Sequence, residues 1–239
     1  MKTALRWVEY GLLGVFAVGL AACTEDVDST DVRTSGVYAD MEVLATGNGQ
    51  SEVTVGLKVG GTNSNTFLEL DGEDELVASA DGQNRNLTER GNYYEATFDT
   101  DAGGTEFKVA FNRGPEDTDA PDSHVTLPAP FELAGLDQGQ TVSRADGFTL
   151  TWETSPDDDD MRWELDGDCL FHESDGISDT GTVTISASDF DPHSGDEDTT
   201  CNARICVERS RRGSVDSAFG EGGVIEAIQR RCVSFESAP

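Results

Sequence analysis

Hydrophobic positions alternate with polar ones along most of the chain after residue 36. The segment 53–59 reads Val-Thr-Val-Gly-Leu-Lys-Val, and the segment 37–45 has the same period of two. This period is typical of a β-strand that is buried on one face. The Gly-Asn-Gly sequence at 47–49 lies between the two runs and predicts that they form a hairpin.

Similar runs continue to the end of the chain. Asp81-Gly82 is a second hairpin signal between two such runs. No segment after residue 36 shows the 3.6-residue period of an amphipathic helix. Further strands are predicted at residues 66–70, 76–80, 83–87, 93–98, 107–111, 148–152, 161–171, 182–187, 201–209 and 224–236. About seven short strands before residue 113 favour a β-sandwich, with a barrel as the alternative.

Residues 114–136 have a different character, because four of the seven prolines fall there. Proline removes a backbone donor, so this stretch is predicted to be an extended connector with at most an edge strand. The expected fold is therefore all-β, with two tandem sandwich domains over residues 36–135 and 136–239.

The second of these domains opens with the strand Phe148-Thr-Leu-Thr-Trp152, the loop 153–160 and the long strand 161–171. This order resembles immunoglobulin-like and fibronectin type III sandwiches, in which an L-x-W strand precedes a long central strand. The resemblance is loose and covers residues 140–237. It implies a fold and leaves function open.

The first 22 residues are predicted to be an export signal. Lys2 and Arg6 give a positive start, and an uncharged, largely apolar run covers residues 10–20. The run ends in Leu-Ala-Ala-Cys at 20–23, which resembles the lipobox of bacterial lipoproteins. That resemblance implies cleavage before Cys23, a thioether-linked diacylglycerol on its sulfur, and an acyl chain on the new amino terminus.

The same resemblance bears on location. In such lipoproteins an aspartate after the lipidated cysteine favours retention in the inner membrane. Thr24 stands at that position here, so the resemblance implies anchoring to the outer membrane. The alternatives are an ordinary signal peptide with a chance cysteine and an uncleaved anchor. The mature chain also resembles uncharacterised proteobacterial lipoproteins, which supplies no role.

Residues 23–35 are polar and show no apolar period. They are predicted to be a flexible, lipidated tether with a reach of about 40 Å at roughly 3.3 Å per residue.

Four cysteines remain after Cys23, and export favours disulfides over thiols. Side chains alternate between the faces of a strand, so parity can choose the pairing. Cys169 and Cys201 are in phase with apolar neighbours, whereas Cys206 and Cys232 are in phase with charged or polar ones. The expected bridges are Cys169–Cys201 in the core and Cys206–Cys232 on the outer face. A four-cysteine metal site is the alternative, but no C-x-x-C pair is present.

The formal charge is −31 and only three lysines occur, so nucleic acid and anionic lipid are not expected partners. The negative charge is interpreted as a feature that keeps the protein soluble in a salty medium, with divalent-cation binding as the alternative. The D-x-D-x-D-G pattern of a calcium loop is absent. The calcium candidates are the acidic loop residues Asp157, Asp158, Asp159, Asp160, Asp189 and Asp191.

No catalytic motif is visible, and no cofactor is expected beyond the lipid on Cys23. His124, His172 and His193 stand alone, outside any nucleophile or metal motif. Distant residues could still assemble a triad in space. Six arginines fall in the last 36 residues. They are interpreted as offsetting nearby carboxylates, or as a contact patch for an anionic partner or for the first domain.

The expected function is a non-enzymatic binding or structural module of the cell envelope. The membrane is the expected partner through the lipid anchor, together with an unidentified protein or glycan. The alternatives are a secreted hydrolase or its accessory subunit, and a calcium-dependent adhesion module.

Overall fold

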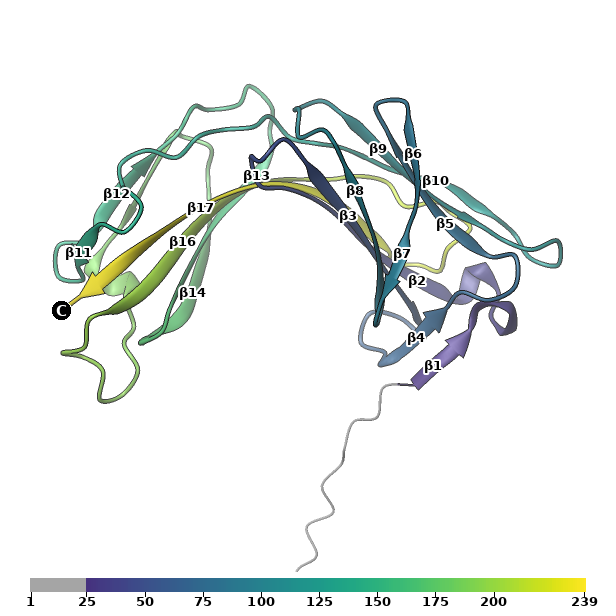
Figure 1. Ribbon diagram of the computed structural model, residues 1–239, viewed down its shortest axis with the longest axis horizontal. Helices are drawn as coiled ribbons and strands as arrows, with labels where there is room; N and C mark the ends of the chain where they lie inside the picture. The colour runs from purple at the N-terminus through teal and green to yellow at the C-terminus, as the bar shows by residue number, and fades with distance from the viewer. Residues whose placement is uncertain (1–24) are drawn as a thin grey trace, which may run out of the picture.

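The computed structural model describes residues 25–239 and shows an all-β arch (Figure 1). Three short 3-10 helices accompany the strands, and no helix within the described range is long and apolar enough to cross a membrane. The elements of the first half are β1 (Glu25–Asp28), η1 (Ser29–Asp31), η2 (Thr34–Gly36), β2 (Val37–Ala45), β3 (Ser51–Val59), β4 (Thr66–Glu69), β5 (Glu75–Ala80), β6 (Gln83–Asn86), β7 (Thr88–Arg90), β8 (Tyr93–Phe98), β9 (Glu106–Asn112) and β10 (Ala120–Thr126). Those of the second half are β11 (Thr141–Ser143), β12 (Phe148–Thr151), β13 (Asp160–Gly167), β14 (Leu170–Ile177), β15 (Thr182–Ile185), η3 (Ala187–Asp189), β16 (Cys201–Arg212) and β17 (Val224–Ala238).

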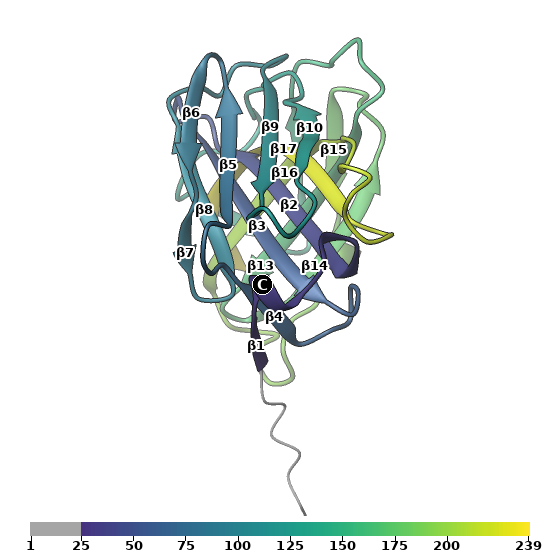
Figure 2. The ribbon, with the colours of Figure 1, turned by 90° about the vertical axis from the view of Figure 1, so that its right-hand side faces the viewer.

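One continuous sheet forms the arch. Its strands follow the order β1-β4-β3-β2-β17-β16-β13-β14, with β8 and β7 added beside β3 and β11 added beside β17. Two smaller sheets lie against its convex side. The sheet β10-β9-β5-β6 covers the first half, and the pair β12-β15 covers the second (Figure 1). Figure 2 shows the strands of the four-stranded sheet crossing in front of the diagonal β2 and β3.

Each covering sheet closes a separate hydrophobic core. In the first core, Phe98 and Phe107 are fully buried and meet edge to face. In the second core, Leu150 of β12 packs with Trp163 and Leu165 of β13. Burial of such side chains contributes about 1.5–3 kcal/mol each, so these two clusters stabilise the layers.

The two cores are not separate tandem domains, which corrects the expected division at residue 135. The 15-residue strand β17 pairs in parallel with β2 through residues 224–229, and it pairs with β16 along its length. Ile225 and Ala227 therefore enter the first core, although they come from the end of the chain. Phe131 of the connector enters the second core. The long strand β17 therefore joins the two halves, each with its own core, into one continuous sheet.

The segment after Thr24 is also different from the expected flexible tether. Residues 25–28 form β1, which pairs in parallel with β4, and residues 29–36 form two short 3-10 turns. Ser29 and Thr34 are buried. Their hydroxyls find hydrogen-bond partners inside the fold, so a sequence that is polar can still be ordered.

The local hairpin predictions are confirmed. β2 and β3 pair across Gly47 and Gly49, and β5 and β6 pair across Asp81-Gly82, both of which have a positive φ. The predicted strand 161–171 is wrong in one respect. The chain turns at residues 168–169 and returns as β14, and Cys169 lies buried in this turn with its disulfide to Cys201.

Candidate functional site: the open face of the central sheet

The concave side of the arch, opposite both cores, is not covered by any other layer of the described chain (Figure 1). We call this side the open face. It is made by every second side chain of β3, β2, β17, β16 and β13. Adjacent strands align these side chains in rows, and most members are charged or polar. One row contains Thr54, Glu42, Glu226 and Arg212. Another contains Arg230, Glu208 and Arg162, and a third contains Ser234, Arg204 and Asp166.

Glu208 is the centre of the most tightly paired row. Its side chain is 1% exposed, yet it carries a carboxylate. The Nε of Arg162 donates to one carboxylate oxygen at 2.5 Å, and the Nε of Arg230 donates to the other. Two arginines on one buried carboxylate satisfy its charge, and removing either would leave a poorly compensated anion.

A second row places like charges side by side. Glu42 of β2 lies directly across from Glu226 of β17 in the parallel pairing that joins the two halves of the sheet. Burial raises the pKa of the Glu42 carboxyl, and the neighbouring Glu208 and Glu226 charges raise it further against the lowering effect of Arg230. The seam between the two halves therefore carries electrostatic repulsion on its open face.

Two shallow hollows lie along this face. One, of about 640 Å³, includes Asp166, Asp168, Asn202, Arg204, Ser234 and Glu236 in its lining. The other, of about 630 Å³, includes Asp160, Arg162, Asp175, Glu208, Arg212 and Glu226. Both linings mix hydrogen-bond donors with acceptors and contain few apolar side chains. Such surfaces suit a polar ligand held by many hydrogen bonds.

The structure forms the two disulfides that strand parity predicts. Cys169 and Cys201 are joined at the end of the second core, and Cys206 and Cys232 are joined across β16 and β17 on the open face. The second bridge is more covered than expected, since Cys206 is only 8% exposed. The row that contains the Cys206–Cys232 bridge lies between the rows that line the two hollows. Disulfides are typical of exported proteins, so the chain is expected to fold in an oxidising compartment.

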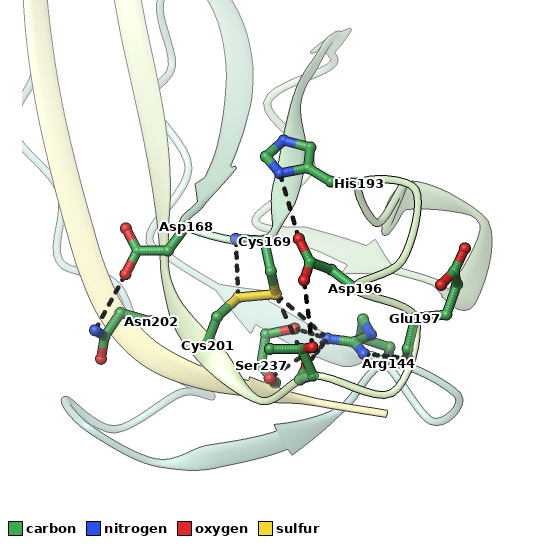
Figure 3. The surroundings of a disulfide bond; sticks show 10 residues. Arg144, Asp168, Cys169, His193, Asp196, Glu197, Cys201, Asn202 and Ser237 are labelled. Atoms are coloured by element: carbon green, nitrogen blue, oxygen red, sulfur yellow. Dashed lines mark hydrogen bonds and ion pairs between the residues drawn. A yellow bond between two sulfur atoms is a disulfide. The ribbon is translucent and has the colours of Figure 1, made fainter.

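Arg144 holds the acidic loop that follows β15 (Figure 3). This side chain is 6% exposed and points at the Cys169–Cys201 bridge. It donates to the carbonyl of Glu197 at 2.6 Å and to that of Thr199 at 3.0 Å. The sequence analysis did not single out Arg144, because its partners are carbonyl groups 53 and 55 residues away.

Within residues 25–239, each histidine side chain lies beside an aspartate, and none hydrogen-bonds to the side chain of a serine, threonine or cysteine. His172 lies 2.8 Å from Asp166, but its side chain is half exposed. Ser234, the hydroxyl in the same row, lies three strands from His172, since Arg204 and Asp166 stand between them. At 4.7–4.9 Å per strand this separation is about 14 Å, too far for proton transfer. His124 and His193 are partly exposed and lie beside other carboxylates.

The calcium candidates have other partners or lie apart. Asp157 and Asp159 both accept hydrogen bonds from Arg211. Asp189 caps η3, where its carboxylate accepts from the backbone and hydroxyl of Ser186. Among residues 25–239, no group of three or more acidic, cysteine or histidine side chains is arranged to hold a metal ion.

The C-terminal arginines have three different roles. Arg211 and Arg230 neutralise carboxylates, as the sequence predicted. Arg209 and Arg231 point inward, with guanidinium carbons 5.0 and 5.6 Å from the ring centre of Phe131, and Arg209 also pairs with the carboxylate of Asp179. Within the described range, Arg204 and Arg212 make no ion pair and remain on the open face. Strand parity could have predicted that Arg209 points inward, because it lies on the same face of β16 as the buried Val207.

Cys23, the predicted lipidation site, lies outside the described residues, as does the export signal. The structure therefore leaves the anchor a prediction.

No protein-family model matches the chain, and no curated protein matches it. The chain aligns at low identity with several solved structures. The FN1–FN3 domains of chicken CNTN1 align over 84% of this chain and 64% of that one, at 8% identity and a TM-score of 0.26. A two-domain fibronectin type III segment of chicken tenascin aligns over 84% and 98%, at 9% identity and 0.26. A 1.5-MDa bacterial ice-binding adhesin aligns over 86% and 67%, at 10% identity and 0.23. Likeness at this level says nothing of function, and the all-β class rests on the strands themselves.

Proposed function

We propose that the chain is an exported lipoprotein, anchored to the outer membrane through Cys23, that serves as a non-enzymatic binding module of the cell envelope. Its binding surface is the open face. The observation that carries this proposal is the arrangement of the layers: both covering sheets lie on the convex side, which leaves a broad, polar, concave surface. The partner is a protein segment or glycan rich in hydrogen-bonding groups.

The rigidity of the arch supports a binding role. β17 belongs to both halves, and Arg209 and Arg231 both contact Phe131 of the connector. A preorganised concave surface binds with a smaller entropic cost than a flexible one. Arg204 and Arg212 then lie at fixed places eight residues apart on β16, about 26 Å at roughly 3.3 Å per residue.

The anchor is tested by metabolic labelling with palmitate and by membrane fractionation. We expect the native protein to be labelled and to sediment with outer membranes, and the Cys23→Ser variant to lose both properties. A Cys23→Ser protein that still sediments with membranes, although it is not labelled, would contradict the lipid anchor.

The binding surface is tested by site-specific photocrosslinking in intact cells. A crosslinker at Arg204 or Arg212 should capture a partner. The matched control is Arg85, an exposed arginine of β6 in the covering sheet. Equal capture from Arg85, or capture from Arg85 alone, would place the binding surface elsewhere.

A hydrolase is the second candidate, because Asp166, which pairs with His172, lines the first of the two hollows. Hydrolysis of ester or glycoside reporters that is lost in a His172→Gln variant would favour it over a binding module.

A further inference from the structure

The segment that follows the anchor cysteine is bound to the first half of the arch. β1 pairs with β4 from Glu25 opposite Thr66 to Asp28 opposite Glu69. Next along the chain, the hydroxyl of Ser29 donates to the carboxylate of Asp74 at 2.7 Å. Ser29 is fully buried.

Arg113 also binds this segment. Its guanidinium donates to the carbonyls of Ser29 and Val32 at 2.8 and 3.0 Å, and to the hydroxyl of Thr34 at 3.0 Å. The same group pairs with Asp74 at 2.8 Å, and the side chains of Arg113 and Asp74 are 1% and 2% exposed. Releasing this segment leaves the ion pair in place but takes three acceptors from the buried Arg113 guanidinium, so the bound state of the segment is favoured.

We propose that residues 25–36 are a strap that holds the first half of the arch against the lipid surface. The proposal rests on the lipid anchor at Cys23. Only Thr24 separates that cysteine from β1, so the reach falls from about 40 Å for a flexible tether to about 7 Å for two residues. The headgroup layer of the bilayer is then the neighbour of the surface around the start of β1.

The strap also directs the open face. The start of β1 lies at the foot of the arch, on the side to which the concave face opens (Figure 1). A lipid at this foot turns the open face toward the membrane. Its partner is therefore a molecule that lies close to the membrane surface.

Limited trypsin digestion tests whether the strap is closed. Arg33 is exposed and is the only basic residue between Cys23 and β2, so cleavage there frees the body from lipid vesicles. We expect the native lipidated protein to resist cleavage at Arg33. An Arg113→Met variant should be cut on the order of 100-fold faster, because proteolysis follows the population of the open segment.

The matched control is Arg90→Met, which removes an exposed arginine of the same half. Its cleavage rate at Arg33 should equal that of the native protein. Rapid cleavage of the native protein, at the rate of Arg113→Met, would overturn the strap. Amino-terminal sequencing identifies the cleavage at Arg33, so this test of the strap does not require vesicle binding. Failure of the protein to bind vesicles would speak against the lipid anchor and not against the strap.

A distance measurement tests the consequence without disturbing Arg113. A donor dye at an Asn63→Cys substitution, in the loop before β4, transfers energy to an acceptor on lipid headgroups. Twelve Gly/Ser residues inserted between Thr24 and Glu25 add a root-mean-square span of about 19 Å. We expect strong transfer in the parent protein and a marked loss after the insertion. Equally strong transfer in both would refute the strap, whereas no transfer in either would speak against the lipid anchor.

Discussion

Replacing Arg209 with methionine is expected to weaken the fold more than any change at an exposed arginine. The Arg209 side chain is 1% exposed. It donates to the carbonyls of Ala129 and Glu153 at 2.8 and 3.0 Å, and to the carboxylate of Asp179 at 2.8 Å. These contacts tie the connector and the loop before β13 to the inward face of β16. Methionine keeps most of the apolar volume and removes every one of these hydrogen bonds.

The size of the effect follows from what is left behind. Breaking a buried ion pair costs about 3–5 kcal/mol. Asp179 keeps hydrogen bonds from Trp152 and from the backbone of Ser155, which compensate part of its charge. We therefore expect a loss near the lower end, about 3 kcal/mol. In a protein of this size, that loss lowers the Tm by roughly 6–12 °C.

The assay is guanidinium unfolding of oxidised protein at neutral pH, with Arg204→Met as the matched control on the same strand. The midpoint of Arg209→Met should fall without a change in slope, and the control should stay within about 0.5 kcal/mol of the native protein. A difference of less than about 1 kcal/mol between the two variants would refute the assigned role of Arg209.

The pH dependence of the same variant gives an independent check. Burial raises the pKa of Asp179, but hydrogen bonds from Ser155 and Trp152 and the charge of Arg209 outweigh it and bring that pKa below 3.8. A carboxyl group whose pKa is lower in the folded state than in the unfolded state stabilises the fold at pH values above its unfolded-state pKa. That stability is lost as the pH falls through the folded-state pKa. Arg209→Met should therefore lose less stability than the native protein on acidification below pH 4.

Three further predictions concern the seam, the disulfides and metal ions. Since the pKa of Glu42 is raised above 4.5, its contribution to stability is complete below that pH and is lost as the pH rises through the folded value. Glu42→Gln should raise the Tm at pH 7 by up to about 4 °C, in line with a cross-strand repulsion of about 0.2–1 kcal/mol, and an unchanged Tm would contradict the repulsion. Replacing Cys169 and Cys201 by serine opens a bridge with a sequence separation of 32 and should cost about 3–4 kcal/mol in denaturant unfolding; no measurable loss would show that the bridge does not constrain the unfolded chain. Calorimetry with millimolar calcium should give no heat of binding and no rise in Tm, whereas saturable heat would restore the calcium hypothesis.

Local sequence patterns were sufficient for the strands and the disulfides. Alternation placed Cys169 and Cys201 on the inward side and so gave the pairing. The Asp81-Gly82 turn fixed a hairpin because both residues adopt a positive φ there. These features depend on neighbours in the sequence or on strand parity alone.

The joining of the two halves could not be predicted in the same way. β17 pairs with β2 across a separation of more than 180 residues, and nothing in either strand specifies the other as its partner. The order of residues 25–36 was missed because it depends on Arg113, which lies about 80 residues away. The open face was missed for a related reason: its rows form only when five strands are aligned, so the side chains of Glu208 and Arg162 meet although 46 residues separate them.

The most direct measurement is the intact mass of the protein extracted from membranes without reduction. A lipid-anchored, oxidised arch predicts a polypeptide of residues 23–239 that carries a diacylglycerol and an acyl chain, with its other four cysteines resistant to alkylation until they are reduced. A cytoplasmic polypeptide with residues 1–22 still attached and with thiols that react at once would contradict it.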